Sequence, residues 1–176
     1  MSQTVAELLV GVLEQIGVKH IFGLIGDSLN PLADAVRRSK IEWVGVRHEE
    51  GAALAAAGQA KLTGRLAVCA GTTGPGSTHL VAGLYEASRD HAPVLALSGD
   101  MIRHLHGTEY IQTTEPYLLF RDVSLYTETI SSPAQAPAVI LQAIAAAYAG
   151  RGVAHLSFHK MSLGRRRKAP PPVSQP

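Results

Sequence analysis

The feature of this sequence that most limits its fold is the alternation of short apolar runs with longer segments of helical periodicity. Several of the runs are apolar throughout, which is typical of parallel strands, because helices cover both faces of a parallel sheet. We therefore predict an α/β fold with a doubly wound, mainly parallel six-stranded sheet and helices on both faces. The predicted strands are residues 18–25, 41–46, 66–70, 93–98, 124–130 and 153–158.

The segments between the apolar runs carry the end signals of helices. In residues 4–16, apolar side chains recur every three or four positions, Thr4 is a suitable N-cap and Gly17 a suitable stop. Residues 49–62 are rich in alanine and are followed by Gly64, so a helix should end there. Other helices are predicted over residues 27–36, 77–88 and 132–149, a helical turn over 116–120, and an irregular polar segment over 100–115.

The length and composition indicate a single globular domain. The 176 residues are 46% hydrophobic and 17% charged, which excludes a disordered chain. We predict one domain over residues 1–163 and a basic, proline-rich tail over residues 164–176. Cys69 is the only cysteine, which excludes a disulfide framework, and its apolar surroundings predict an unreactive thiol. With no long apolar run and no signal-peptide pattern at the N-terminus, we expect a cytoplasmic protein without a membrane span.

The net charge of +2 comes from the tail. Residues 165–168 read Arg-Arg-Arg-Lys, and without them acidic residues outnumber basic ones. Such a cluster can contact nucleic acid or an acidic surface, whereas the alternative is a solvated tail. The acidic body argues against nucleic-acid binding.

Three segments with unusual chemistry each follow a predicted strand. They are residues 23–28 (Gly-Leu-Ile-Gly-Asp-Ser), 47–51 (Arg-His-Glu-Glu-Gly) and 71–76 (Gly-Thr-Thr-Gly-Pro-Gly). Because the carboxyl ends of parallel strands meet at one edge of the sheet, and ligands bind at that edge, we expect these segments to converge on one site.

Within these segments, Glu49 is the candidate catalytic residue. An acid at a helix start is favoured by the macrodipole, by about 0.3–1 kcal/mol, and that role suffices for Glu50. Glu49 instead stands directly at the binding edge, among alanines and glycines that would hydrate it poorly, which suits a proton-sharing role. The glycine loop at residues 71–76 is suited to an anion, but Pro75 lacks an N–H donor and a tight strand-to-helix turn is the alternative.

The eight histidines do not predict a metal site. His104 and His106 form a His-x-His pair, and His155 and His159 lie in or after the last predicted strand. Because no acidic residue stands at ligand spacing from them, we predict surface or core histidines and no metal ligands.

An ordered set of motifs along the chain resembles the pyrimidine-binding (PYR) domain of thiamine-diphosphate enzymes. The resemblance is closest to pyruvate oxidases and pyruvate:quinone dehydrogenases, with acetolactate synthase next, and covers about residues 3–153. The matching segments are residues 17–23 (Gly-Val-Lys-His-Ile-Phe-Gly), 26–30 (Gly-Asp-Ser-Leu-Asn), 47–53, 69–76, 79–84, 93–97 and 131–133.

The resemblance implies a role for five residues. Glu49 would hydrogen-bond the aminopyrimidine ring of thiamine diphosphate and promote the tautomer that activates the cofactor. Gly74 and Pro75 would lie against the pyrimidine, with His79 near the cofactor and Gln112 on the substrate side. Relatives follow that Gln with Glu, where this sequence has Thr113, and many close the last strand with Pro-x-Asp, where residues 159–161 read His-Lys-Met.

The same enzymes bind the diphosphate and Mg²⁺ through a second domain with a Gly-Asp-Gly motif followed by Asn. Here the sequence offers Gly26-Asp27-Ser28 and Gly99-Asp100-Met101, and Asn30 is the only asparagine. We therefore expect this chain to bind only the pyrimidine end, with Mg²⁺ supplied by a partner domain, and to act on a 2-keto acid only with that partner. The alternative is a solitary, truncated PYR domain without catalysis that forms homo-oligomers or acts as an interaction module.

Overall fold

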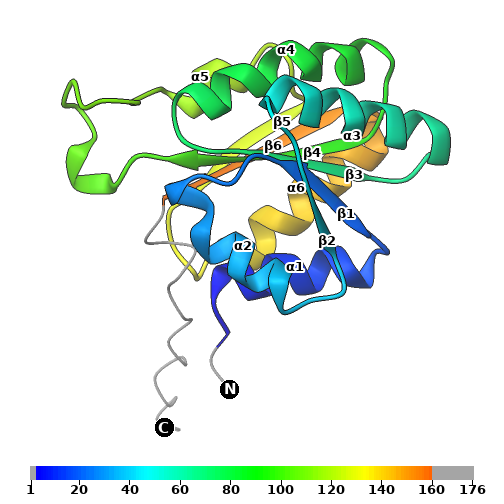
Figure 1. Cartoon of the computed structure of the whole chain (residues 1–176), viewed down its shortest axis with the longest axis horizontal. Coiled ribbons are helices and arrows are strands. Elements are labelled where there is room, and N and C mark those ends of the chain that lie inside the picture. The colour runs from blue at the N-terminus through cyan, green and yellow to red at the C-terminus, as the bar shows by residue number, and fades with distance from the viewer. Residues whose placement is uncertain (1–2, 160–176) are drawn as a thin grey trace, which may run out of the picture.

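The computed structural model describes residues 3–159, which form a six-stranded sheet with helices on both faces (Figure 1). Every neighbouring pair of strands is parallel, and the order across the sheet is β2-β1-β3-β4-β6-β5. The predicted α/β fold class is therefore confirmed, and the sheet is wholly parallel. The strands are β1 (His20–Gly23), β2 (Glu42–Gly45), β3 (Ala67–Gly71), β4 (Val94–Asp100), β5 (Tyr126–Ile130) and β6 (Val153–His159).

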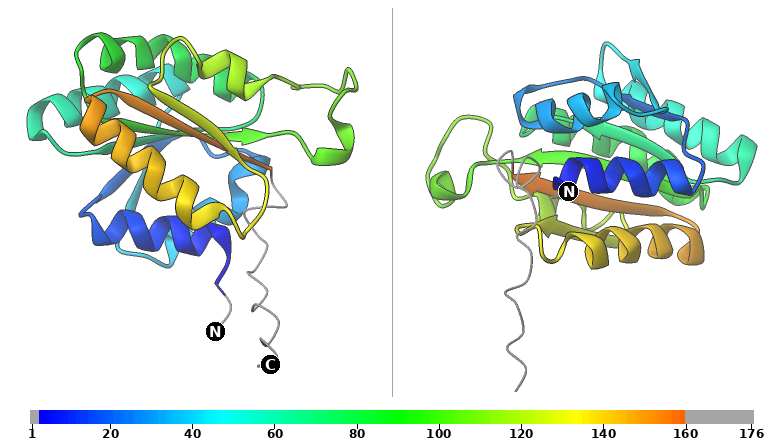
Figure 2. Two further views of the ribbon diagram at one scale, coloured as in Figure 1. Left: turned by 180° about the vertical axis from the view of Figure 1, so that it is seen from behind. Right: turned by 90° about the horizontal axis from the view of Figure 1, so that it is seen from below.

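Within residues 3–159, six α-helices cover the two faces of the sheet in two layers (Figures 1 and 2). One layer consists of α1 (Val5–Gln15), α2 (Asn30–Arg37) and α6 (Ala136–Gly150). The other consists of α3 (Glu49–Thr63), α4 (Pro75–Arg89) and α5 (Pro116–Phe120). Two 3₁₀ turns, η1 (Asp27–Leu29) and η2 (Arg103–Leu105), lie in the loops after β1 and β4. Each layer buries its own apolar cluster against the sheet.

The start of α1 and the end of α3 form where the sequence predicts them. The Thr4 hydroxyl accepts a hydrogen bond from the Glu7 backbone N–H, and the Glu7 carboxylate accepts one from the Thr4 backbone N–H. Both hydrogen bonds of a capping box are therefore present at the start of α1. At the C-terminal end of α3, Gly64 adopts a left-handed conformation with φ of 68°, which ends the helix. These local signals fix where α1 begins and where α3 ends.

The central strands β3, β4 and β6 are buried along their whole length. Alternate side chains of β3 enter opposite layers, since Val68 and Ala70 belong to one apolar cluster and Cys69 to the other. Burial raises the pKa of the Cys69 thiol to about 12, which agrees with the packed thiol that the sequence predicts.

Several element boundaries differ from the sequence-based expectation, among them three at or near the carboxyl edge of the sheet. Helix α4 begins at Pro75, two residues before the predicted Ser77, because proline suits the first turn of a helix. Strands β4 and β6 continue past their predicted ends to Asp100 and His159, since they pair with each other along their full length. The predicted basic tail at residues 164–176 lies outside the described residues. Within residues 3–159, no helix has the length and apolarity needed to span a membrane.

His155 in the middle of β6 gives a test of this core. Its Nε2 hydrogen-bonds the Ser98 hydroxyl at 2.8 Å and its Nδ1 the Thr127 hydroxyl at 2.7 Å. Its ring stacks on Phe120 with 3.6 Å between ring centroids. Burial lowers the pKa of His155 to about 3.

We therefore predict that acid destabilises the fold through His155. Because its pKa is lower in the folded than in the unfolded state, the unfolded chain binds more protons between about pH 3 and about pH 6.5, and stability is lost as pH falls through that window. The contribution amounts to about 2 kcal/mol between pH 7 and pH 5. Urea unfolding of the wild type and of His155→Gln at both pH values measures it. Equal pH sensitivity of the two proteins contradicts the prediction.

Candidate functional site

The three segments that follow β1, β2 and β3 converge at the carboxyl edge of the sheet, as the sequence predicts. The Ser28 hydroxyl, in η1, hydrogen-bonds the Thr72 hydroxyl at 2.9 Å and accepts from the Thr73 backbone N–H at 3.2 Å. A side chain on Gly26 would collide with Thr72, and one on Gly99 would collide with Ser28. The loops after β1 and β3 and the end of β4 are therefore packed tightly against one another at this edge.

Glu49 begins α3 and points into the protein. It is 4% exposed, whereas the neighbouring Glu50 is exposed. In the described part of the chain, the one side-chain hydrogen bond of the Glu49 carboxylate joins its Oε2 to Nδ1 of His79, at 3.0 Å. The His48 ring, at the N-cap of α3, stacks on His79 with 4.3 Å between centroids. The sequence predicted Glu49 and His79 in one site, but not the stacking of His48.

The second carboxylate oxygen of Glu49 faces the glycine loop. A Cβ on Gly76 would stand 3.1 Å from Glu49 Oε1, so only a glycine leaves that side of the carboxylate bare. A Cβ on Gly71 would stand 2.5 Å from the Gly76 carbonyl oxygen, which shows how tightly the loop closes. The arrangement presents a buried carboxylate with one oxygen held by an imidazole and the other next to the backbone of Gly76, which carries no side chain.

Gln112 reaches the same loop from the segment after β4. Gly74 has a φ of 71°, and a Cβ there would stand 2.6 Å from the Gln112 carbonyl oxygen. Gln112 itself has a φ of 66°. The structure thus brings Gly74 and Gln112 into contact, while Pro75 forms the exposed first turn of α4.

A hollow of about 390 Å³ opens beside these loops. Ser28, Thr73, Asp100 and Gln112 contribute to its polar lining. Glu49, Pro75 and His79 are not among the described residues that line it, so the hollow belongs to the Gln112 side of the site. Ser28 and Thr73 belong to the segments that the sequence predicted to converge, whereas Asp100 was not predicted, although its position shortly after the predicted strand at residues 93–98 was a signal for it.

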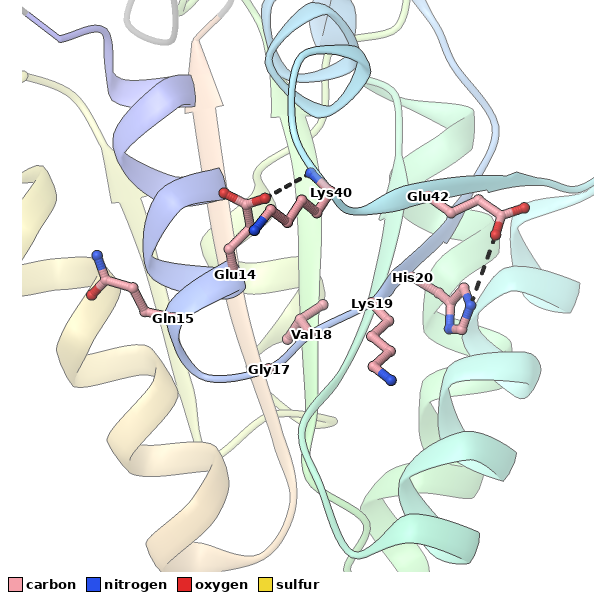
Figure 3. A pocket seen from close by; sticks show the side chains of 8 residues that line it. All are labelled: Glu14, Gln15, Gly17, Val18, Lys19, His20, Lys40 and Glu42. Atoms are coloured by element: carbon pink, nitrogen blue, oxygen red, sulfur yellow. Dashed lines mark hydrogen bonds and ion pairs between the residues drawn. The ribbon is translucent and has the colours of Figure 1, made fainter.

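A larger hollow, of about 600 Å³, lies at the opposite edge, near the amino ends of β1 and β2 (Figure 3). It is lined by acidic and basic side chains, and the basic ones include Lys19 and Lys40. Figure 3 shows Glu14 accepting a hydrogen bond from the Lys40 backbone N–H, at 2.6 Å. Because ligands of parallel sheets bind at the carboxyl edge, the size of this hollow does not identify it as the site.

Comparison with known proteins gives consistent similarities. Residues 3–117 match the family described as the N-terminal TPP binding domain of thiamine pyrophosphate enzymes. The chain is 45% identical to an uncharacterized 42.6 kDa protein of Pseudomonas amyloderamosa, over 98% of this chain and 46% of that protein. It is 45% identical to pyruvate oxidase of Lactiplantibacillus plantarum, over 83% of this chain and 24% of the relative. It is 38% identical to acetolactate synthase of Arthrospira platensis, over 84% and 26%. The chain spans less than half the length of each of these relatives.

The glycine loop generates a prediction about stability. Gly74→Ala should lower the free energy of unfolding by about 1–3 kcal/mol, because a side chain is strained at positive φ and would press on Gln112. Gly58→Ala, in α3, should raise it by about 0.5–1 kcal/mol, because a Cβ there meets nothing within 4 Å and alanine favours the helix. Urea unfolding measures both, and a Gly74→Ala protein as stable as wild type contradicts the assignment.

Proposed function

We propose that this chain, which belongs to the family of N-terminal TPP binding domains of thiamine pyrophosphate enzymes, is the pyrimidine-binding half of an enzyme. The proposed enzyme decarboxylates a pyruvate-like 2-keto acid. The observation that carries the proposal is the environment of Glu49. It is a buried carboxylate at the carboxyl edge of the sheet, with Oε2 on His79 and Oε1 toward Gly76.

These residues fit the aminopyrimidine end of thiamine diphosphate. A neutral ring nitrogen needs a partner that shares a proton, and Glu49 offers Oε1 for it. Gly74 and Gly76 carry no side chain that would stand between the ring and the loop backbone, and Pro75 adds an apolar surface at the start of α4. The residues that would hold the ring are therefore Glu49, Gly74, Pro75 and His79.

The cofactor, when bound, supplies the carbanion chemistry by which a 2-keto acid loses carbon dioxide. Glu49 shares a proton with the pyrimidine nitrogen. His79 holds the carboxylate in position through the 3.0 Å hydrogen bond, and the stacked His48 ring limits the movement of His79. Glu49, His79 and His48 thus act by orienting groups and by fixing the position of a proton. The N-terminus of α3, where Glu49 and His48 stand, is a rigid element that can provide such positioning.

We place the substrate on the Gln112 side. The hollow of about 390 Å³ is large enough for a small keto acid, and its polar lining includes Ser28, Thr73 and Gln112. The relatives named pyruvate oxidase and acetolactate synthase support a substrate of the pyruvate class. Thr113, which follows Gln112 where relatives carry Glu, leaves a hydroxyl in place of a carboxylate.

The diphosphate and its Mg²⁺ would be bound by a partner domain, and the proposed setting is the cytoplasm.

A non-catalytic, self-associating PYR domain is the second candidate. It is favoured by large apolar side chains that are exposed on this domain, such as Leu62 (90%), Ile111 (74%) and Leu118 (64%). A diphosphate-binding partner whose addition yields turnover of a 2-keto acid supports the first candidate. A mixture that leaves every 2-keto acid intact, with the chain itself oligomeric, supports the second.

Cofactor binding can be tested on this chain without turnover. We expect titration calorimetry with thiamine diphosphate and Mg²⁺ to detect binding to the wild type. Glu49→Gln should weaken it at least about tenfold, because the charge-assisted hydrogen bond to the pyrimidine is lost. Glu50→Gln is the matched control: it changes the adjacent acid in the same helix turn, which is exposed, and should bind as the wild type does. Equal binding by all three proteins would overturn the assignment of Glu49.

A further inference from the structure

Three side chains with metal-binding chemistry meet at the ends of β4 and β6. Asp100 is the last residue of β4 and His159 the last of β6, and the two are register partners. His106 comes from the segment just after η2, which folds back toward the sheet. None of the three takes part in the proposed binding of the pyrimidine.

The spacing of the three side chains is close to that of ligands around an ion. Asp100 Oδ2 lies 3.6 Å from His159 Nδ1, and Asp100 Oδ1 lies 3.8 Å from His106 Nε2. Both distances exceed those of N–H···O hydrogen bonds, about 2.7–3.2 Å. Two ligands bound to one tetrahedral zinc ion at about 2.0–2.1 Å stand about 3.3–3.4 Å apart. One ligand atom from each residue can be chosen so that all lie within 4.8 Å of one another.

The two imidazoles already turn one nitrogen each toward a common point. His106 Nε2 and His159 Nδ1 both hydrogen-bond the carbonyl oxygen of Met101, the first at 3.2 Å. Their rings are nearly perpendicular, at 89°, with 5.0 Å between centroids. The ring nitrogens, the Asp100 carboxylate and this carbonyl therefore surround one small volume, and an ion there needs only that the nitrogens present lone pairs instead of protons.

Burial gives this cluster a reason to bind a cation. Asp100 is 4% exposed and His159 is 7% exposed, while His106 stands at the surface. The Asp100 carboxylate has therefore lost most of its contact with water, which is costly for a charged group. A divalent ion compensates a buried carboxylate more fully than the hydrogen bond from the Met101 N–H, at 2.7 Å, and two longer contacts to imidazoles do.

We propose that Asp100, His106 and His159 bind one divalent transition-metal ion of the zinc type, with the Met101 carbonyl or a water as fourth ligand. Two imidazole nitrogens and one carboxylate oxygen suit Zn²⁺, whereas Mg²⁺ prefers oxygen ligands alone. The site is thus separate from the Mg²⁺ that accompanies the diphosphate. The sequence did not predict it because no acid stands at ligand spacing from His104 and His106, and strand register supplies Asp100 and His159 instead.

The ion would fasten the segment between β4 and α5 to the sheet. Asp100 and Met101 line the same hollow as Gln112, six residues beyond His106 in the chain. An ion at this position holds η2 against the ends of β4 and β6, and so limits where Gln112 can stand relative to Gly74.

The experiment is metal binding by the full chain after treatment with a chelator. We expect calorimetry to give one Zn²⁺ per chain, Zn²⁺ to raise the thermal unfolding midpoint, and Co²⁺ to give the visible spectrum of nitrogen- and oxygen-bound cobalt. His106→Gln and His159→Gln should each weaken Zn²⁺ binding at least about tenfold and abolish the Co²⁺ spectrum. His104→Gln, in η2 two residues away, is the matched control and should bind as the wild type does.

Two results would overturn the proposal. One is a wild-type chain that gives neither the Co²⁺ spectrum nor a Zn²⁺-dependent shift in the unfolding midpoint. The other is Zn²⁺ binding that survives both substitutions or is lost equally in His104→Gln. Because His106 is exposed, its variant should fold, and far-ultraviolet circular dichroism checks this. Glu49→Gln should bind Zn²⁺ normally, so failure of the proposed cofactor site and failure of the metal site are distinguishable.

Discussion

The close approach of α3 and α4 is the contact on which the candidate site depends. A Cβ on Gly83 of α4 would stand 2.6 Å from the Glu50 carbonyl oxygen and 2.8 Å from the Ala53 side chain. The facing side of α3 is made of buried alanines, so the two helices pack nearly backbone to backbone. His79 lies one turn before Gly83 on α4, and this packing therefore brings its ring to the first turn of α3, where Glu49 begins the helix. A larger residue at position 83 would separate the imidazole from the carboxylate without touching either.

This packing also explains how a carboxylate can be buried at the edge of the sheet. An isolated buried carboxylate costs several kcal/mol, and a hydrogen-bonded partner offsets part of that cost. For Glu49 the partner is His79, and the α3 N-terminus adds a favourable dipole. Both compensations act on the helix side and leave Oε1 facing the glycine loop. The same residue is thus stabilised from one direction and available from the other.

The parts of this structure that depend on local sequence were predictable, and those that depend on strand register were not. Apolar periodicity, Thr4 and Gly64 located α1 and α3, and continuously apolar runs indicated a parallel sheet whose carboxyl edge would carry Glu49. The ends of β4 and β6 were placed too early, because their last residues, Asp100 and His159, look like loop residues until the strands are paired. The hydroxyl contacts of His155 could not be foreseen for the same reason: Ser98 and Thr127 belong to neighbouring strands, far apart in the chain.

Register also couples the two sites at this edge. Asp100 and His159 are held opposite each other by full-length pairing of β4 and β6, and the chain that leaves β4 passes His106 before it reaches Gln112. Gln112 then presses its carbonyl against Gly74 in the loop that faces Glu49. An ion that fixes the start of this segment therefore restricts its far end, and through Gly74 it restricts the loop beside Gly76. Gln112 and Gly74 meet through their backbones, and both have a positive φ. Small displacements of the segment therefore cannot be absorbed by rotating a side chain. Order in the segment between β4 and α5 is in this way a condition for order in the glycine loop.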